Sequence, residues 1–251
     1  MHTSPFHLRA CATWAAILLG VPLCGMGATT VTVPGTADFY LAGMPNGSIA
    51  SNVDVAPTQS PVLVPGSLPT AGSALTFTNV TGSVRQDPGY PYEPADGYAS
   101  SYIRHLESQG LTMSEDGIGD LLAPYDALIG VFLGPNLPTT LTAPIGLNFS
   151  STSNPSFTNI GTLDFASLSP LLQQPFFIGD GHTSGSAVQT FIVPAGATRL
   201  YLGTMDGWGW YNNGGSFSVQ VNGIIDVPEP ASLAVLGLGA MALLARRRRL
   251  S

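Results

Sequence analysis

Hydrophobic residues in the central part of the chain come in short runs that alternate with polar residues or end at turn-forming residues. Long stretches with a helical period of 3.6 are missing, and glycine, proline, serine, threonine and asparagine separate the runs. This pattern is typical of β-strands joined by turns. The clearest expected strands are residues 74–80, 127–133, 188–193, 198–202 and 216–221. We therefore expect an all-β body, an antiparallel β-sandwich spanning residues 28–226.

Helix is expected only in fragments. Residues 99–109 carry Tyr102 and Leu106 at helical spacing and are followed by Gly110, and residues 167–172 suffice for one turn. The stretch from Gln86 to Gly97 contains three prolines, which block both a helix and a central strand, so it is expected to be a surface loop.

The C-terminal part, residues 227–251, has a different pattern. Its residues 231–245 carry no charge and are followed by four consecutive arginines. As a helix these fifteen residues span roughly 22 Å, and snorkelling arginines extend that reach towards the ~30 Å membrane core. Basic residues favour the cytoplasmic side, which places the body outside the inner membrane. A buried core helix with a basic end is the alternative.

The order of these features is similar to the PEP-CTERM sorting signal of Gram-negative bacteria. The matching residues are the sorting motif Pro228, Glu229 and Pro230, the apolar segment, and the cluster Arg246, Arg247, Arg248 and Arg249. The resemblance implies an exosortase-type membrane protease as partner. It also implies an inner-membrane anchor before processing, and then a place in the cell envelope or outside the cell.

The N-terminus, residues 1–27, has the pattern of a secretory signal peptide. Basic residues precede an apolar stretch from Trp14 to Leu23, and small residues at Gly27 and Ala28 suit cleavage by signal peptidase. An uncleaved anchor and a lipoprotein signal at Cys24 are alternatives. Both cysteines lie in this segment, so the mature body is expected to have no disulfide.

The body is strongly acidic. Between the two targeting segments there are three arginines, no lysine and fourteen acidic residues. Such a surface repels nucleic acid and suits divalent cations or neutral glycans.

The loop between the last two expected strands holds the main candidate site. Oxygen donors come from Asp206, Asn212 and Asn213, as predicted metal ligands, and Ca²⁺ favours six to eight such hard oxygens. Flat faces for a sugar ring come from the predicted ligand-binding residues Trp208, Trp210 and Tyr211. A hairpin loop without any ligand is the alternative.

This loop and the strand after it resemble bacterial calcium-dependent galactose-binding lectins, which have a galactose-binding-like β-sandwich of jelly-roll type. The resemblance implies that Asp206, Asn212 and Asn213 hold Ca²⁺ and that the ion binds sugar hydroxyls. The spacing from Asp206 to Asn212 is one residue shorter than in that family. A weaker match in the opening strands includes residues 39–43.

Other polar groups are expected to have no chemical role. We interpret residues 179–182 and Ser184 as polar loop, and residues 115–120 as a solvated acidic loop, with a second cation site as the alternative. The two body histidines are far apart and predict no zinc site.

We therefore expect a non-enzymatic binding or matrix protein associated with exopolysaccharide. The alternatives are a structural surface protein without a discrete ligand, and a secreted polysaccharide hydrolase that uses two of Asp180, Glu115, Asp116 and Asp206.

Overall fold

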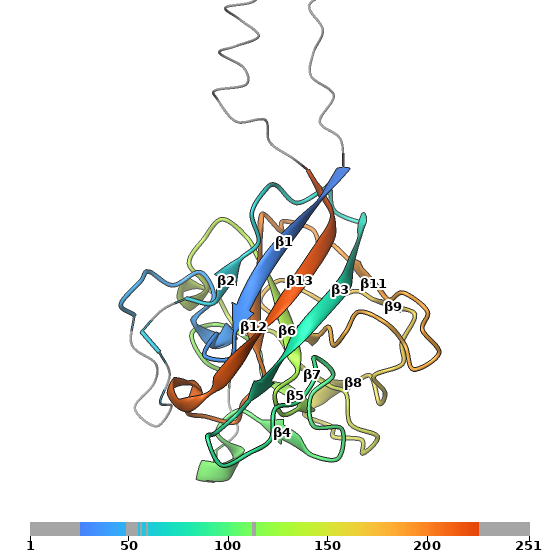
Figure 1. Ribbon diagram of the computed structural model, residues 1–251. Coiled ribbons are helices and arrows are strands. Elements are labelled where there is room, and N and C mark those ends of the chain that lie inside the picture. The colour runs from blue at the N-terminus through green and yellow to red at the C-terminus, as the bar shows by residue number, and fades with distance from the viewer. Residues whose placement is uncertain (1–25, 49–54, 56, 59, 112–113, 226–251) are drawn as a thin grey trace, which may run out of the picture.

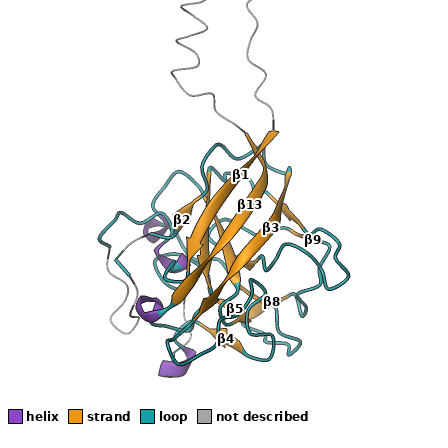
Figure 2. Cartoon of the chain, in the orientation of Figure 1, coloured by secondary structure: helices purple, strands orange, loops and turns teal. Residues whose placement is uncertain are grey.

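The computed structural model describes residues 26–48, 55, 57–58, 60–111 and 114–225. The expected signal helix and the expected C-terminal membrane helix lie outside these residues. The described chain is all-β, as predicted, with three sheets and four single 3₁₀ turns (Figure 2). The 3₁₀ turns are η1 (Phe39–Leu41), η2 (Glu107–Gln109), η3 (Pro138–Thr140) and η4 (Trp210–Asn212).

The largest sheet contains the two longest strands, which pair side by side in antiparallel register (Figure 1). In spatial order it consists of β1 (Met26–Pro34), β13 (Gly214–Ile225), β3 (Ala74–Arg85), β11 (Thr190–Ile192) and β9 (Ser167–Leu168).

Two four-stranded sheets complete the fold. One has the order β10 (Pro175–Phe177), β6 (Leu128–Leu133), β12 (Arg199–Thr204) and β2 (Val62–Leu63). The other has the order β4 (Tyr102–Arg104), β5 (Leu121–Pro124), β7 (Gly146–Asn148) and β8 (Phe157–Asn159). Three pairs, β9 with β11, β5 with β7 and β7 with β8, are parallel, so the expectation of a purely antiparallel arrangement is wrong. The architecture is otherwise consistent with a β-sandwich.

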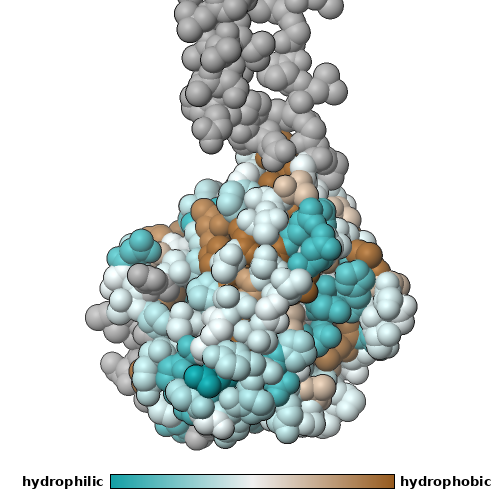
Figure 3. Space-filling model, in the orientation of Figure 1, coloured by the Kyte–Doolittle hydropathy of each residue, from teal (hydrophilic) through white to brown (hydrophobic). Residues whose placement is uncertain are grey.

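Alternation along β13 explains which face of the large sheet is buried. Phe217, Val219 and Val221 are completely buried, whereas Ser218 and Gln220 between them are not. The outer face of β13 therefore carries uncharged polar side chains, and the view in Figure 3 shows mostly pale or hydrophilic residues with a few hydrophobic patches. On this face the Asn79 amide of β3 donates to the Gln220 side chain of β13 across the sheet.

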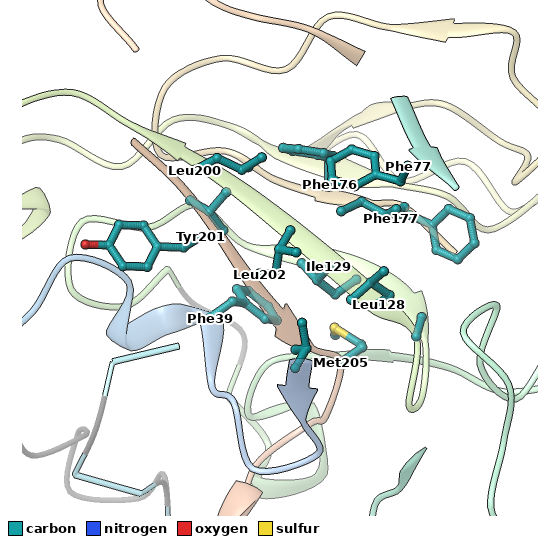
Figure 4. Close-up of a cluster of buried hydrophobic side chains, with 14 of the residues drawn as sticks. Phe39, Phe77, Leu128, Ile129, Phe176, Phe177, Leu200, Tyr201, Leu202 and Met205 are labelled. Carbon is teal, nitrogen blue, oxygen red and sulfur yellow. The ribbon is translucent and has the colours of Figure 1, made fainter. Parts of the chain in front are cut away.

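The core joins the five-stranded sheet to the sheet that contains β6 through packed aromatic rings (Figure 4). All six residues of β6 are buried, because this strand lies inside its sheet with side chains covered on both faces. Phe176 stacks on Phe132 at 5.2 Å between ring centroids and contacts Phe191 of the large sheet at 5.4 Å. A single continuous hydrophobic cluster results.

The five expected strands are present as β3, β6, β11, β12 and β13, with β3 and β13 longer than predicted. The irregular loop at 86–97 is also confirmed. Both helix predictions are wrong. Residues 102–104 form β4, Leu106 has a left-handed φ of 56°, and residues 167–168 form β9. The expected opening strand at Phe39–Leu41 is η1 instead.

The two ends of the described chain lie side by side. Met26 at the start of β1 pairs with Ile225 at the end of β13, at the top of the large sheet in Figure 1. The segments before and after the body therefore leave from the same end of the fold, which we call the tether end. The beginning of β13 lies at the opposite end, and the candidate loop is attached there.

Candidate binding site

The loop from Met205 to Asn213 joins β12 to β13 and contains the 3₁₀ turn η4. The carboxylate of Asp206 caps this loop, since its Oδ1 accepts hydrogen bonds from the backbone N–H groups of Gly207 (2.6 Å) and Trp208 (3.4 Å). Asn212 points towards a second loop, and its Nδ2 donates to Asp87 Oδ2 at 2.9 Å. The two loops are therefore linked side chain to side chain.

Two of the three predicted calcium ligands meet. Asp206 and Asn212 line one cavity of about 210 Å³, together with Asp87, which sequence analysis did not single out. Asn213 is not part of that lining. It is buried, and its Nδ2 donates to the Gly35 carbonyl at 3.1 Å. Among the described residues, no three histidine, cysteine, aspartate or glutamate side chains lie close enough together to hold a metal ion.

The three predicted aromatic contacts separate into two groups. Trp208 and Tyr211 are exposed, at 38% and 61% of their surface. Trp210 is completely buried, crosses the rings of Phe39 and Tyr40 edge to face, and donates from Nε1 to the Thr204 carbonyl at 2.8 Å. Its ring is part of the core and offers no face to a ligand, which corrects the expectation for this residue.

Exposed aromatic rings gather around the two linked loops. Among the described residues, the exposed aromatic side chains are Tyr90, Tyr92, Tyr98, Trp208 and Tyr211. We call this set the aromatic platform. Tyr90, Trp208 and Tyr211 line the cavity just described, and Tyr90 and Tyr98 line a neighbouring one. The alternation of tyrosine and proline in the 86–98 loop is the sequence signal for this surface, although by itself it predicts only irregular structure.

The neighbouring cavity, of about 120 Å³, has a buried carboxylate in its wall. Asp126 is only 2% exposed, and burial, with the charges of Asp206 and Glu93, raises its pKa to about 8. The same surroundings raise the pKa of Tyr125 to about 12, mainly through burial. A carboxyl group with a raised pKa destabilises the fold once it ionises.

Stability is therefore expected to fall as pH rises from about 4 to about 8 in the presence of chelator, because the unfolded chain loses the Asp126 proton first. Asp126→Asn removes this cost. At pH 9 we expect its melting temperature to exceed that of the wild type by about 3 to 6 °C, with little difference at pH 4. Thermal unfolding followed by circular dichroism measures this. Equal melting curves at pH 9 would show that the carboxylate is well solvated.

A larger cavity, of about 640 Å³, is lined by Asp96, Asp164, Asp180 and His182. Burial raises the pKa of Asp96, and hydrogen bonds from Ser184 lower that of Asp164. The carboxylates bind loop atoms: Asp96 accepts from the Asp180 N–H and Asp180 from the His182 N–H. The Ser184 hydroxyl donates to Asp164 at 2.7 Å, so these groups organise the loop and do not form a nucleophile pair with His182.

The acidic segment at 115–120 is not the solvated loop that the sequence predicted. Glu115 and Asp120 are buried. Their partners are Arg104, the last residue of β4, and His105, which follows it. His105 Nε2 lies 2.6 Å from Glu115 Oε2, and Arg104 Nη2 donates to Asp120 Oδ2 at 2.6 Å. The Arg104–Asp120 ion pair therefore links the end of β4 to the residue before β5. Among the described residues, no group of three acidic, histidine or cysteine side chains here could hold a second cation.

Fold and site together define an all-β domain with an aromatic and acidic surface at the end opposite its tether. A family model for the PEP-CTERM protein-sorting motif matches residues 226–249. The chain is thus an exported protein that is held at the membrane through its C-terminus and then processed by an exosortase. No curated protein and no solved structure matches it. Within the described residues, no helix is long and apolar enough to cross a membrane.

Proposed function

We propose that the exported body is a non-enzymatic binding protein that holds a glycan, such as the exopolysaccharide of the cell envelope, on the aromatic platform. The observation that carries the proposal is the gathering of the exposed aromatic rings of the described chain on two linked loops. The C–H faces of sugar rings pack on tyrosine and tryptophan, whose rings are rigid and amphipathic.

Polar groups beside the platform suit sugar hydroxyls. Asp87, Asp206 and Asn212 line the cavity that also contains Trp208 and Tyr211, so hydrogen-bond acceptors and apolar faces lie together. An acidic body with three arginines disfavours nucleic acid and anionic polymers. A neutral glycan is the partner that fits both properties.

Calcium dependence is part of this proposal. The cavity presents the side-chain oxygens of Asp87, Asp206 and Asn212, and an ion there would lie next to the platform, where it would coordinate hydroxyls of the bound sugar. Binding that survives chelator would assign recognition to the aromatic rings alone.

The position of the platform suits display. β13 has twelve residues and runs from the platform to the tether end, a length of roughly 40 Å at about 3.3 Å per residue. The platform therefore lies at the end of β13 opposite the tether end, from which the C-terminal segment leaves the body. Such a geometry favours contact with polymer outside the membrane.

The test is affinity electrophoresis of the exported protein in gels that contain exopolysaccharide of the producing cells, with and without chelator. Trp208→Ala combined with Tyr211→Ala is expected to weaken retardation by about tenfold or more, since two ring contacts are lost. Leu63→Ala, an equally exposed apolar residue on β2, is the matched control and should change nothing.

Two results would contradict the proposal. Absence of retardation for the wild type on a broad glycan panel would favour a structural surface protein without a discrete ligand. Release of reducing sugar that is lost on Asp96→Asn or Asp180→Asn would favour a polysaccharide hydrolase acting at the larger acidic cavity.

A further inference from the structure

Asp126 is buried beneath the loop that carries three of the platform's tyrosines. Its backbone adopts a left-handed φ of 66°, and its N–H donates to the Met205 carbonyl at 2.8 Å. The Oδ1 atom of its carboxylate is buried and has no hydrogen-bond partner among the described residues. A buried acceptor of this kind normally costs free energy unless a ligand, proton or ion satisfies it.

The 86–98 loop closes over this carboxylate. The Tyr98 N–H donates to the Tyr125 carbonyl at 2.8 Å, and the Leu128 N–H donates to the Ala95 carbonyl at 2.9 Å. These two hydrogen bonds fix the loop to the residues on either side of Asp126, and the loop and Asp126 together line the cavity of about 120 Å³. At ~30 Å³ per water, the space suffices for one ion with two or three waters.

Further oxygens line the same cavity. Glu93 contributes a second carboxylate, and Gln86 contributes an amide oxygen, Oε1, that is also buried and has no hydrogen-bond partner in the described chain. Two acceptors without donors and a second negative charge thus surround one small space. All of these donors are hard oxygens, which suit Ca²⁺ better than a transition metal.

The described arginines and histidines are engaged elsewhere. Arg104 pairs with Asp120, Arg199 donates to main-chain carbonyls, and His105 contacts Glu115. Arg85 lies over the Tyr92 ring at 4.8 Å and donates to the Pro88 carbonyl. His182 lies beside Asp180. None of the described arginines or histidines lines the cavity of Asp126, and the chain contains no lysine.

We propose that this cavity binds a divalent cation, Ca²⁺, through Asp126 Oδ1, the amide oxygen of Gln86 and the carboxylate of Glu93, with water completing the coordination. The ion joins the 86–98 loop to the 125–128 segment and so fixes Tyr90 and Tyr98 in the aromatic platform. It is distinct from the calcium position at Asp206 and Asn212, and it requires no bound glycan.

The test uses the full chain in detergent micelles, with CaCl₂ alone as the probe. Millimolar Ca²⁺ is expected to raise the melting temperature by about 3 to 6 °C over chelator, as for extracellular sites of modest affinity. Asp126→Asn and Gln86→Leu should lose most of this gain. Asn212→Ala, which removes an oxygen from the other position, should retain it.

Tb³⁺ provides a direct readout, because tyrosine rings in the cavity wall sensitise its luminescence. We expect emission from the wild type that Ca²⁺ displaces, a loss of at least fivefold in Asp126→Asn, and a normal signal in Asn212→Ala. No Ca²⁺ effect in the wild type, or loss in Asn212→Ala with retention in Asp126→Asn, would overturn the assignment. Glycan binding is not part of either readout, so its failure would contradict only the proposed function.

Discussion

Replacing Trp210 with alanine is expected to lower the free energy of unfolding by about 3 to 5 kcal/mol, the range for removing a large aromatic ring from a core. The ring is completely buried, packs edge to face on Phe39 and Tyr40, and donates a hydrogen bond from Nε1 to the Thr204 carbonyl. The substitution leaves a cavity and removes the donor for a carbonyl at the end of β12. Urea denaturation measures the change when it is followed by the backbone circular dichroism signal, which does not depend on tryptophan fluorescence.

Trp208→Ala is the matched control, because the same side chain is removed from the same loop two residues earlier. Trp208 is 38% exposed, so we expect a change below about 1 kcal/mol in stability. The two variants should thus separate stability from binding: Trp210→Ala unfolds more easily, whereas Trp208→Ala stays folded and loses retardation by glycan. Similar destabilisation in both would contradict the placement of Trp208 at the surface.

Sequence alone could not tell these two tryptophans apart. They stand in Gly207-Trp208-Gly209-Trp210, a segment without helical or strand periodicity, so neither side chain has a predicted face. The direction is set by Gly209, whose φ of 92° reverses the backbone just before η4 and turns Trp210 inward. Conformations with positive φ depend on the surrounding fold, and glycine permits them without specifying them.

The long strands were predictable because alternation over many residues leaves few alternatives. β3 and β13 each have twelve residues, and within the predicted parts Leu75 and Phe77 of β3 and Phe217, Val219 and Val221 of β13 are buried at alternate positions. The helix prediction for residues 99–109 was wrong because its pattern rested on very few positions. Tyr102 and Leu106 are four residues apart, which suggested a helix, but Ile103 is the buried position of the short strand β4, and His105 and Leu106, both buried, follow that strand. That strand is fixed by pairing with β5 and by the Arg104 guanidinium, which lies over the Phe157 ring.

Only one of the two loops that form the candidate site could be predicted from the sequence. The β12–β13 loop was identified from its concentration of amide, carboxylate and aromatic residues, yet its partner, the 86–98 loop, comes more than 100 residues earlier. Asn212 and Asp87 meet only because β3 and β13 are neighbours, so that the chain after β3 and the chain before β13 leave the sheet at the same end. Strand order is a tertiary property, which local patterns do not contain.

Glu115→Ala is expected to cost about 3 to 5 kcal/mol of stability, the range for breaking a buried charged or strongly hydrogen-bonded pair from one side. Glu115 Oε2 lies 2.6 Å from Nε2 of His105, and the His105 imidazole is completely buried and stacked on Tyr40 at 4.0 Å between ring centroids. Loss of the carboxylate removes this partner inside the core, where solvent does not replace it. Thermal and urea unfolding of the purified variants measures the effect.

Asp116→Asn is the control next in the chain. It neutralises a carboxylate in the same turn, but asparagine tolerates the left-handed φ of 49° at this position, and burial together with the charge of Glu115 already raises the pKa of Asp116. We expect no loss of stability from it. Glu115→Gln should fall between the two, since the amide keeps a hydrogen-bonding group for the imidazole. Equal stability of the Glu115→Ala and Asp116→Asn variants would contradict the buried pair and restore the interpretation of residues 115–120 as a solvated loop.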